Sequence, residues 1–456
     1  MNETAESELL CGAAMVDITP WRGVQLGGDI GRRRPAEFVN DPIHARALVL
    51  QSGEARICLL SLELIGASGE AVASVQQRAA ERFGFVPESV MVHSLQIHST
   101  PGLGFYLSPS PFIPPDAQWL REGDSEYTEW ATDQIMSAIE TAVEQLEPVT
   151  VSYASGIDAR WAFNRRFVMR DGKVLTHPRN GDPRIRYAEG PMDPEVGVVC
   201  FTAEDLRVPA ILLHYTCHPC HGYPHRYVSA DWPGAWAEGV QAFCGADCVP
   251  LVINGLCGNI HHRNHLDAEQ VDDYRLMGDG LTETAVTAIK RGMTQVAAPR
   301  LAWRAAHVRL PYRDIDSAVD WAREYLEQNP EPVWQDEQRV QCSWDWVHAV
   351  TLMALNESRR RDNGVFDCPL QVFRIGDIAL VSFPGEPFVE GQLRLKVESP
   401  TYPTYAAHNC SNEPGYIPTQ HAFPGGGYET EWGDLQPDAL DAMVDAAAQA
   451  LHEMFE

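Results

Sequence analysis

The alternation of short apolar runs with longer stretches of helical periodicity constrains the fold of this chain more than any other feature. Apolar runs typical of buried strands lie at 56–62, 149–153, 196–201, 210–215, 249–253 and 301–310, with a hairpin predicted from 371–375 and 378–383. Helical periodicity is found at 70–82, 126–145, 267–291, 315–328, 344–361 and 437–454. We therefore expect an α/β fold in which mixed β-sheets are covered by α-helices. The expected unit is a single domain over 1–456, with room for a C-terminal subdomain over about 301–456.

The balance of charged residues excludes several classes of partner. The chain carries 35 Lys and Arg against 63 Asp and Glu, a formal net charge of −28. Nucleic acid and anionic membrane surfaces repel such an acidic protein, and no apolar run approaches the length of a membrane span. The expected partner is a small-molecule substrate, and self-association into a homo-oligomer is left open.

The cysteines and the N-terminus predict the compartment. The 11 cysteines are spread along the chain and do not form a short disulfide framework. The acidic start, residues 1–8, lacks the basic and apolar regions of a signal peptide. We therefore expect reduced thiols and a cytoplasmic location.

Histidines are concentrated where the apolar run 210–215 ends. His214, His218, His221 and His225 are four of the 16 histidines in the chain. Imidazole is the commonest metal ligand and titrates near neutrality, and α/β proteins place their chemistry in loops at strand ends. A single histidine in such a loop is usually a hydrogen-bonded core residue, but the cluster predicts a metal site or an acid–base site.

Three further segments repeat this design, in which an apolar strand is followed by a polar loop. They lie at 90–102, 252–265 and 379–386, and the polar residues that they contribute are Gln96, His98, His261, His262, His265 and Glu386. Gln96 and His98 are two residues apart, so an extended strand would turn both side chains to the same side. Four such strand ends in one chain indicate a site that is assembled from several strands.

These motifs resemble, in kind and in order, the catalytic domain of the neutral/alkaline (non-lysosomal) ceramidase family. They run from Asp17-Ile18-Thr19-Pro20 to Tyr428-Glu429, nearly the whole chain. Between them lie His98-Ser99-Thr100-Pro101-Gly102, Asn164-Arg165-Arg166, Cys217-His218-Pro219, Ser229-Ala230-Asp231, Gly258-Asn259, Pro384-Gly385-Glu386 and Gly415-Tyr416. The resemblance implies a divergent, bacterial-type member with a ceramidase-like catalytic domain, an amidase-like hydrolase that depends on one zinc ion.

The resemblance also implies roles for five residues, by their positions in the motifs. It implies that His218, Glu386 and Tyr416 bind the zinc ion, that His98 stabilises the reacting group, and that Arg165 is an active-site arginine. Nitrogen and oxygen ligands of this kind suit Zn²⁺, and an open position would let a bound water ionise near neutrality.

Two departures from the family pattern change what is expected. Gln96 stands where ceramidases have a zinc-ligating histidine, so either its weak, neutral oxygen or a nearby histidine is expected to complete the metal site. Gly255 stands where they have a serine, and one of His261, His262 and His265, which follow closely, is then expected to replace the missing imidazole or to act as general base, with His261 and His262 preferred. Asp231 has two interpretations: an N-cap of the helix that follows it, or a partner that fixes the tautomer of a ligating histidine.

The sequence thus favours a metal-dependent hydrolase that cleaves a soluble amide or ester by metal-activated water. One alternative is a metal-dependent lyase or glycoside-cleaving enzyme that acts on a sugar-like substrate. Another is a catalytically degenerate protein that binds a small molecule. Ceramide itself is not the expected substrate, because Gly255 replaces the serine and the chain is too short for the additional C-terminal β-domain of ceramidases.

Overall fold

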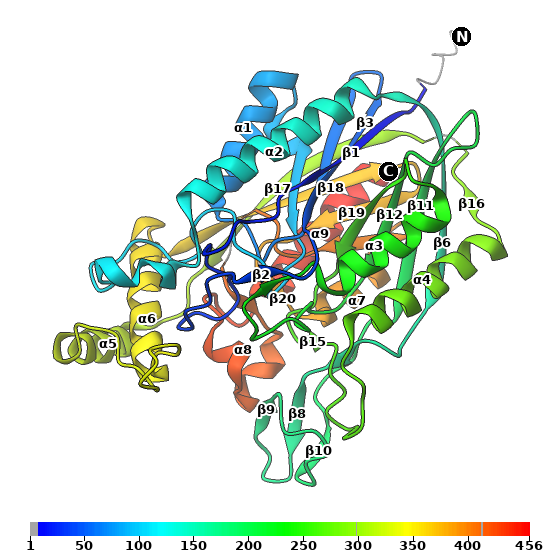
Figure 1. Ribbon diagram of the computed structural model, residues 1–456. Coiled ribbons are helices and arrows are strands. Elements are labelled where there is room, and N and C mark those ends of the chain that lie inside the picture. The colour runs from blue at the N-terminus through cyan, green and yellow to red at the C-terminus, as the bar shows by residue number, and fades with distance from the viewer. Residues whose placement is uncertain (1–7, 298, 412–413) are drawn as a thin grey trace.

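Two β-sheets pack face to face and helices cover the outer face of each, which gives four layers (Figure 1). The structure is a computed structural model that describes residues 8–297, 299–411 and 414–456. The layering follows from alternation along the strands. In β3 (His44–Ser52), Ala47 and Val49 face the helices, whereas Leu48 and Leu50 face the second sheet. The expected α/β fold, with mixed sheets under helices, is confirmed.

The larger sheet has nine strands among the described residues. Its order is β14 (Val249–Asn254), β12 (Ala210–Tyr215), β11 (Glu195–Ala203), β6 (Glu147–Ile157), β1 (Leu10–Asp17), β3, β4 (Ala55–Leu62) and β5 (Val90–Ser94), with β16 (Thr294–Gln295) paired to β6. The pairs β12–β14 and β4–β5 are parallel and the others are antiparallel. Helices α1 (Gly69–Phe83) and α2 (Ser125–Glu144) pack over one half of this sheet, and α3 (Asp231–Cys244) and α4 (Tyr274–Arg291) pack over the other.

The smaller sheet comes from the C-terminal part of the chain. Its strands are β17 (Leu301–Pro311), β18 (Val365–Ile375), β19 (Ile378–Ser382) and β21 (Thr404–Ala407), and β18 and β19 form the expected hairpin. Helices α6 (Trp344–Arg361) and α9 (Ala439–Phe455) share a core with its outer face, with α5 (Asp316–Gln328) against α6 and α7 (Val389–Glu398) against α9. Whether this part forms a subdomain stays a prediction.

Short strands form further pairs and one small sheet outside the two main sheets. The pairs are β2 (Phe38–Val39) with β13 (Tyr227–Val228), β7 (Phe163–Asn164) with β15 (Ile260–His261), and β20 (Glu386–Pro387) with β22 (Tyr416–Ile417). The small sheet consists of β8 (Arg166–Met169), β9 (Val174–Thr176) and β10 (Ile185–Ala188). Helix α8 (Tyr428–Glu431) and three 3₁₀ helices, Pro87–Ser89, Pro115–Arg121 and Gln420–Gly425, complete the elements of the described chain.

Two expected helix starts were wrong. The helix predicted at 267–291 begins only at Tyr274, because the Asp273 carboxylate caps it by accepting a hydrogen bond from the Arg275 N–H; residues 267–272 therefore form a loop. Asp231 does not N-cap α3, since Ala230 holds that position and Asp231 is itself the first helical residue, with a φ of 53°.

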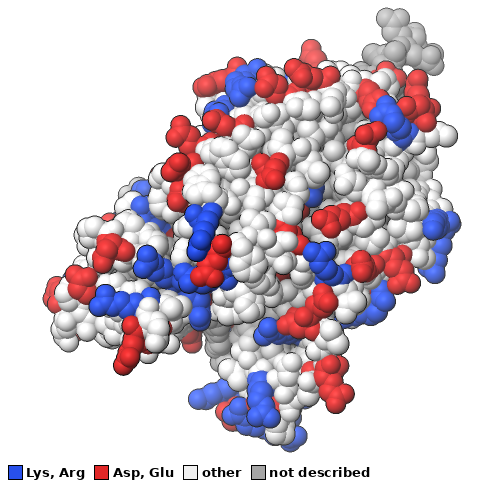
Figure 2. Space-filling model, viewed as in Figure 1, with Lys and Arg blue, Asp and Glu red and all other residues white. Residues whose placement is uncertain are grey.

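Two further observations concern the helices and the surface of the described chain. In the described part of the chain, no helix is both long enough and apolar enough to cross a bilayer. Acidic and basic side chains are interspersed over the face of the molecule that Figure 2 shows. Residues 1–7, on which the expected lack of a signal peptide depends, lie outside the described residues.

Candidate metal-binding and catalytic site

Three of the residues predicted to be metal ligands meet at one end of the larger sheet. His218 follows β12, whereas Glu386 and Tyr416 lie opposite each other in the parallel pair β20–β22. The distance between His218 Nε2 and Glu386 Oε2 is 3.1 Å. His218 and Tyr416 are buried and Glu386 is 14% exposed, so the site reaches solvent through Glu386.

The hydrogen bonds of His218 determine its tautomer. Its Nδ1–H donates to the carbonyl oxygens of Cys257 at 2.7 Å and Ile260 at 3.1 Å. Burial, with the nearby Arg165 guanidinium, lowers the pKa of His218 well below its usual value, so the ring is neutral. The Nε2 atom therefore presents a lone pair to the Glu386 carboxylate. Two acceptors 3.1 Å apart repel each other unless a proton or a metal cation lies between them. A nitrogen beside carboxylate and phenol oxygens is a donor set that suits zinc.

A buried ion network supports Tyr416. The Arg165 guanidinium lies 5.3 Å from the centre of the Tyr416 ring, and it donates to Glu429 Oε1 from Nε at 2.8 Å and to the Gly258 carbonyl at 2.7 Å. Arg166 donates to the other oxygen of Glu429 at 2.7 Å. Burial alone would raise the pKa of Glu429, but the two arginines hold it below its usual value. Burial and the Glu386 charge raise the pKa of Tyr416, so its hydroxyl is protonated when no cation is bound.

His98 has an unpaired nitrogen at the wall of this site. Its Nδ1–H donates to the Gly28 carbonyl at 3.1 Å, whereas Nε2 is buried without a hydrogen-bond partner. The centres of the His98 and His218 rings are 5.6 Å apart. Burial, followed by the proximity of His218, lowers the pKa of His98 to about 3, so the ring is neutral and Nε2 carries a free lone pair.

Gln96, the remaining predicted ligand, contacts a histidine that the sequence did not single out. Its Oε1 lies 2.9 Å from His408 Nε2 and 3.7 Å from Cys257 Sγ. His408 follows β21, a strand that was not predicted, and it repeats the pattern of a strand followed by a polar residue. That pattern was the signal that could have found it. Ligation of a metal by Gln96 stays a prediction.

The histidines predicted as general bases form a cluster beside the His218 site. The backbone of His261 bridges to that of His218, and its ring lies 4.1 Å from His262 and 4.5 Å from His177, measured between ring centres. His262 stacks on His221 at 3.6 Å. Catalytic roles for His261 and His262 stay predictions. His265 joins the cluster with Nε2 at 3.1 Å from His177 Nδ1.

The surroundings of Gly255, where the motif resemblance leads one to expect a serine, are closely packed. A Cβ atom at Gly255 would lie 2.1 Å from Thr216 Oγ1 and 2.3 Å from Gln392 Oε1. Gln392 is held in turn by Thr216 Oγ1 and by the Leu256 N–H, to which it is hydrogen-bonded at 2.8 and 2.9 Å. A buried amide–hydroxyl pair therefore fills the space that a serine side chain would need.

Aromatic side chains lead from the site to the surface. Tyr428, which is 40% exposed, lies 5.5 Å from Tyr416 between ring centres, and it contacts Trp344 and Trp432 at 6.3 and 6.0 Å. Trp344 is 44% exposed, unlike the core residues Trp232, Trp236 and Trp346, which are fully buried. The three outer rings are tilted against one another and form a partly exposed aromatic cluster that reaches Tyr416 through Tyr428.

Comparison with known proteins identifies the fold. No protein-family model matches the sequence, and no curated protein matches it. The structure aligns with neutral ceramidase from Pseudomonas aeruginosa with a TM-score of 0.72 and 17% identity, covering 98% of this chain and 75% of that chain. It aligns with a ceramidase complexed with C2 with a TM-score of 0.73 and 16% identity, covering 98% and 76%. The resemblance inferred from the motifs is thus confirmed at the level of the fold, in a chain whose sequence has diverged far from these neighbours.

Proposed function

We propose that the protein is a metal-dependent hydrolase that cleaves a soluble amide or ester by attack of water. The observation that carries the proposal is the 3.1 Å approach of the His218 Nε2 lone pair to the Glu386 carboxylate, beside the buried Tyr416 hydroxyl. Hydrogen bonds from Nδ1 fix the tautomer, so the repulsion between these acceptors is relieved only by a proton or a cation. We take zinc as the cation because of the donor set.

Each neighbouring residue has a chemical task in this proposal. A divalent ion held by His218, Glu386 and Tyr416 would polarise the substrate carbonyl group and make a water molecule more acidic. His98 is neutral and has a free Nε2 lone pair, so it can accept the proton that water loses and return it to the leaving group. Arg165, buried and held by Glu429, supplies a fixed positive charge next to Tyr416 that stabilises negative charge on the reacting oxygen.

Attack by water is favoured over a serine nucleophile. Gly255 leaves no hydroxyl at the position of the family serine, and the packing of Thr216 and Gln392 leaves no room for one. Water then attacks the substrate carbonyl carbon directly, and the amine or alcohol leaves without formation of an acyl-enzyme. We also propose that its non-reacting part lies on the exposed rings of Tyr428 and Trp344.

We further propose that the enzyme works in the cytoplasm on a soluble substrate. All 11 cysteines, each within the described residues, are free thiols, which suits a reducing compartment. Long-chain ceramide is then expected to be a poor substrate.

The test is product analysis with protein purified without chelator, before and after zinc is removed and restored. The panel contains N-acyl amino acids, short acyl amides and esters, ceramide in detergent micelles, and uronate-containing glycosides. Zinc-dependent release of a carboxylic acid from an amide or ester supports the proposal. Turnover of the glycosides alone would indicate the lyase or glycosidase alternative, turnover of nothing would indicate a binding protein, and strong release of fatty acid from ceramide would overturn the assigned substrate class.

A further inference from the structure

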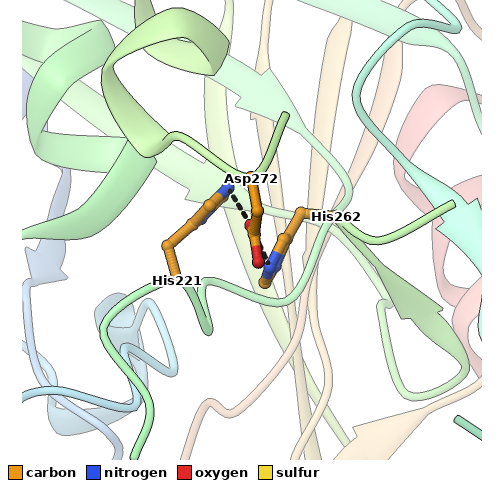
Figure 3. Close-up of side chains that lie close together, drawn as sticks. All are labelled: His221, His262 and Asp272. Carbon is orange, nitrogen blue, oxygen red and sulfur yellow. Dashed lines mark ion pairs between the residues drawn. The ribbon is translucent and has the colours of Figure 1, made fainter. Parts of the chain in front are cut away.

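A second group of metal-ligating side chains lies beside the His218 site. His221 comes from the loop after β12, His262 from the residue that follows β15, and Asp272 from the loop before α4, and their ligand atoms all lie within 4.8 Å of one another. Figure 3 shows the Asp272 carboxylate beside the two imidazole rings, which stack with their centres 3.6 Å apart. Its Oδ1 is 2.9 Å from His262 Nε2 and 3.6 Å from His221 Nε2.

A buried carboxylate fixes the tautomer of His221. Asp231 Oδ1 lies 2.7 Å from His221 Nδ1, and Asp231 is itself held by the N–H groups of Trp232 and Gly222 at 2.7 and 3.2 Å. An Nδ1–H that donates to this carboxylate leaves the lone pair on Nε2, which faces Asp272. A carboxylate that orients a histidine in this way is the usual partner of a metal-ligating imidazole.

The ring nitrogens of His262 lack hydrogen-bond partners of good geometry. It is buried, and neither of its ring nitrogens has a partner with the geometry of a hydrogen bond, although Nε2 lies close to Asp272. A buried polar atom that remains unpaired costs free energy. Coordination of a cation by Nε2 would remove that cost.

We propose that His221, His262 and Asp272 bind a divalent transition-metal ion such as zinc, separate from the His218 site, with Asp231 orienting His221. Ligand atoms about 2.0–2.1 Å from a tetrahedral ion are about 3.3 Å apart, close to the observed 2.9 and 3.6 Å. Two imidazole nitrogens and one carboxylate oxygen form a common zinc donor set. Asp272 is one-third exposed, so a water molecule or a small anion can reach the remaining coordination position.

The second site is linked to the first by a short loop. His262 follows His261, whose backbone bridges to His218, and the same loop carries the Cys257 and Ile260 carbonyls that orient His218 Nδ1. An ion on His262 would therefore restrain the loop that sets the tautomer of His218.

The test is the zinc content of the full-length protein, expressed without a polyhistidine tag and dialysed against buffered zinc. We expect about two equivalents per chain in the wild type and about one in Asp272→Asn and in His221→Gln. The matched control is His307→Gln, because His307 pairs with Asp367 at 3.2 Å but both side chains are more than half exposed and neither belongs to the cluster. This control should keep about two equivalents.

A cobalt-substituted sample gives a second measurement that does not depend on stoichiometry. Part of the visible d–d absorption of Co²⁺ should disappear in Asp272→Asn and remain in His307→Gln, while circular dichroism reports that both variants are folded. His218→Ala should remove the other equivalent. If Asp272→Asn and His221→Gln retain the zinc content and the cobalt spectrum of the wild type, the second site does not exist. If His218→Ala leaves the zinc content unchanged while Asp272→Asn and His221→Gln each lower it, the proposed function fails and the second site stands.

Discussion

Replacement of Glu386 by glutamine should have opposite effects on the metal-free and the zinc-bound protein. Without metal, the carboxylate oxygen and the His218 Nε2 lone pair face each other at 3.1 Å. A glutamine amide can turn its N–H towards Nε2 and form a neutral hydrogen bond, which contributes about 1 kcal/mol. Arg165 keeps its ion pair with Glu429, so the substitution leaves no buried cation unpaired. The metal-free variant should therefore be more stable than the wild type.

Zinc should reverse this order. A bound ion at about 1,000 times its Kd stabilises the folded state by about 4 kcal/mol. Glu386→Gln should lose this stabilisation, because it removes the carboxylate that would coordinate the ion at the His218 site. The entropy of unfolding is about 2.1 cal/mol/K per residue, so for 456 residues roughly 1 kcal/mol changes the Tm by about 1 °C. We expect a Tm about 1 °C higher for the metal-free variant, and a zinc-induced rise that is about 4 °C larger in the wild type than in the variant, because zinc bound by His221, His262 and Asp272 would stabilise both proteins equally.

Calorimetry of the untagged protein, in EDTA and in excess zinc, measures both shifts. Glu431→Gln is the matched control, because it makes the same change at an exposed glutamate of α8 and should alter neither Tm. A metal-free Glu386→Gln protein that unfolds below the wild type would show that the two groups already share a proton. An equal response to zinc in the variant and the wild type would show that Glu386 is not a ligand.

Three further predictions address the other parts of the site and the core. His98→Ala should lower the turnover rate by a factor of about 10²–10⁴ and keep the metal content, whereas His218→Ala should lose both activity and metal. Loss of metal from His98→Ala, measured by elemental analysis, would show that His98 is a ligand. Gly255→Ser should lower the free energy of unfolding by about 1–3 kcal/mol, because its Cβ would lie 2.1 Å from Thr216 Oγ1. The variant should not hydrolyse ceramide. A folded variant that cleaves ceramide would contradict the water mechanism. Burial, followed by the Lys396 charge, lowers the pKa of His214 to about 4, whereas a value of about 6.5 is expected in the unfolded chain. As the pH falls, the unfolded chain therefore binds the proton first. The free energy of unfolding should decrease as the pH drops from about 6.5 to about 4. His214→Phe should reduce the loss between pH 7 and pH 5 by about 2 kcal/mol, and equal losses in urea titrations of both proteins would refute this.

The sequence by itself determined the layers of the fold and the strand ends at which the polar residues gather. Apolar runs and helical periodicity are local patterns, and they placed α6 and the β18–β19 hairpin well because a buried face leaves its period in the chain. The same patterns missed β21, which is short and follows Pro403, and they extended α4 over the loop that holds Asp272.

Only the tertiary structure decided which polar residues meet. His218, Glu386 and Tyr416 were brought together by motif resemblance, but no local pattern could place His408 against Gln96 or join Asp272 to His221 and His262. Such contacts join loops whose positions depend on how the sheets stack and twist. The tautomers depend on the same contacts, because the backbone carbonyls that face His218 Nδ1 and the carboxylate that faces His221 Nδ1 determine where each lone pair points. The sequence supplies the donors and acceptors, and their chemistry depends on partners that folding alone selects.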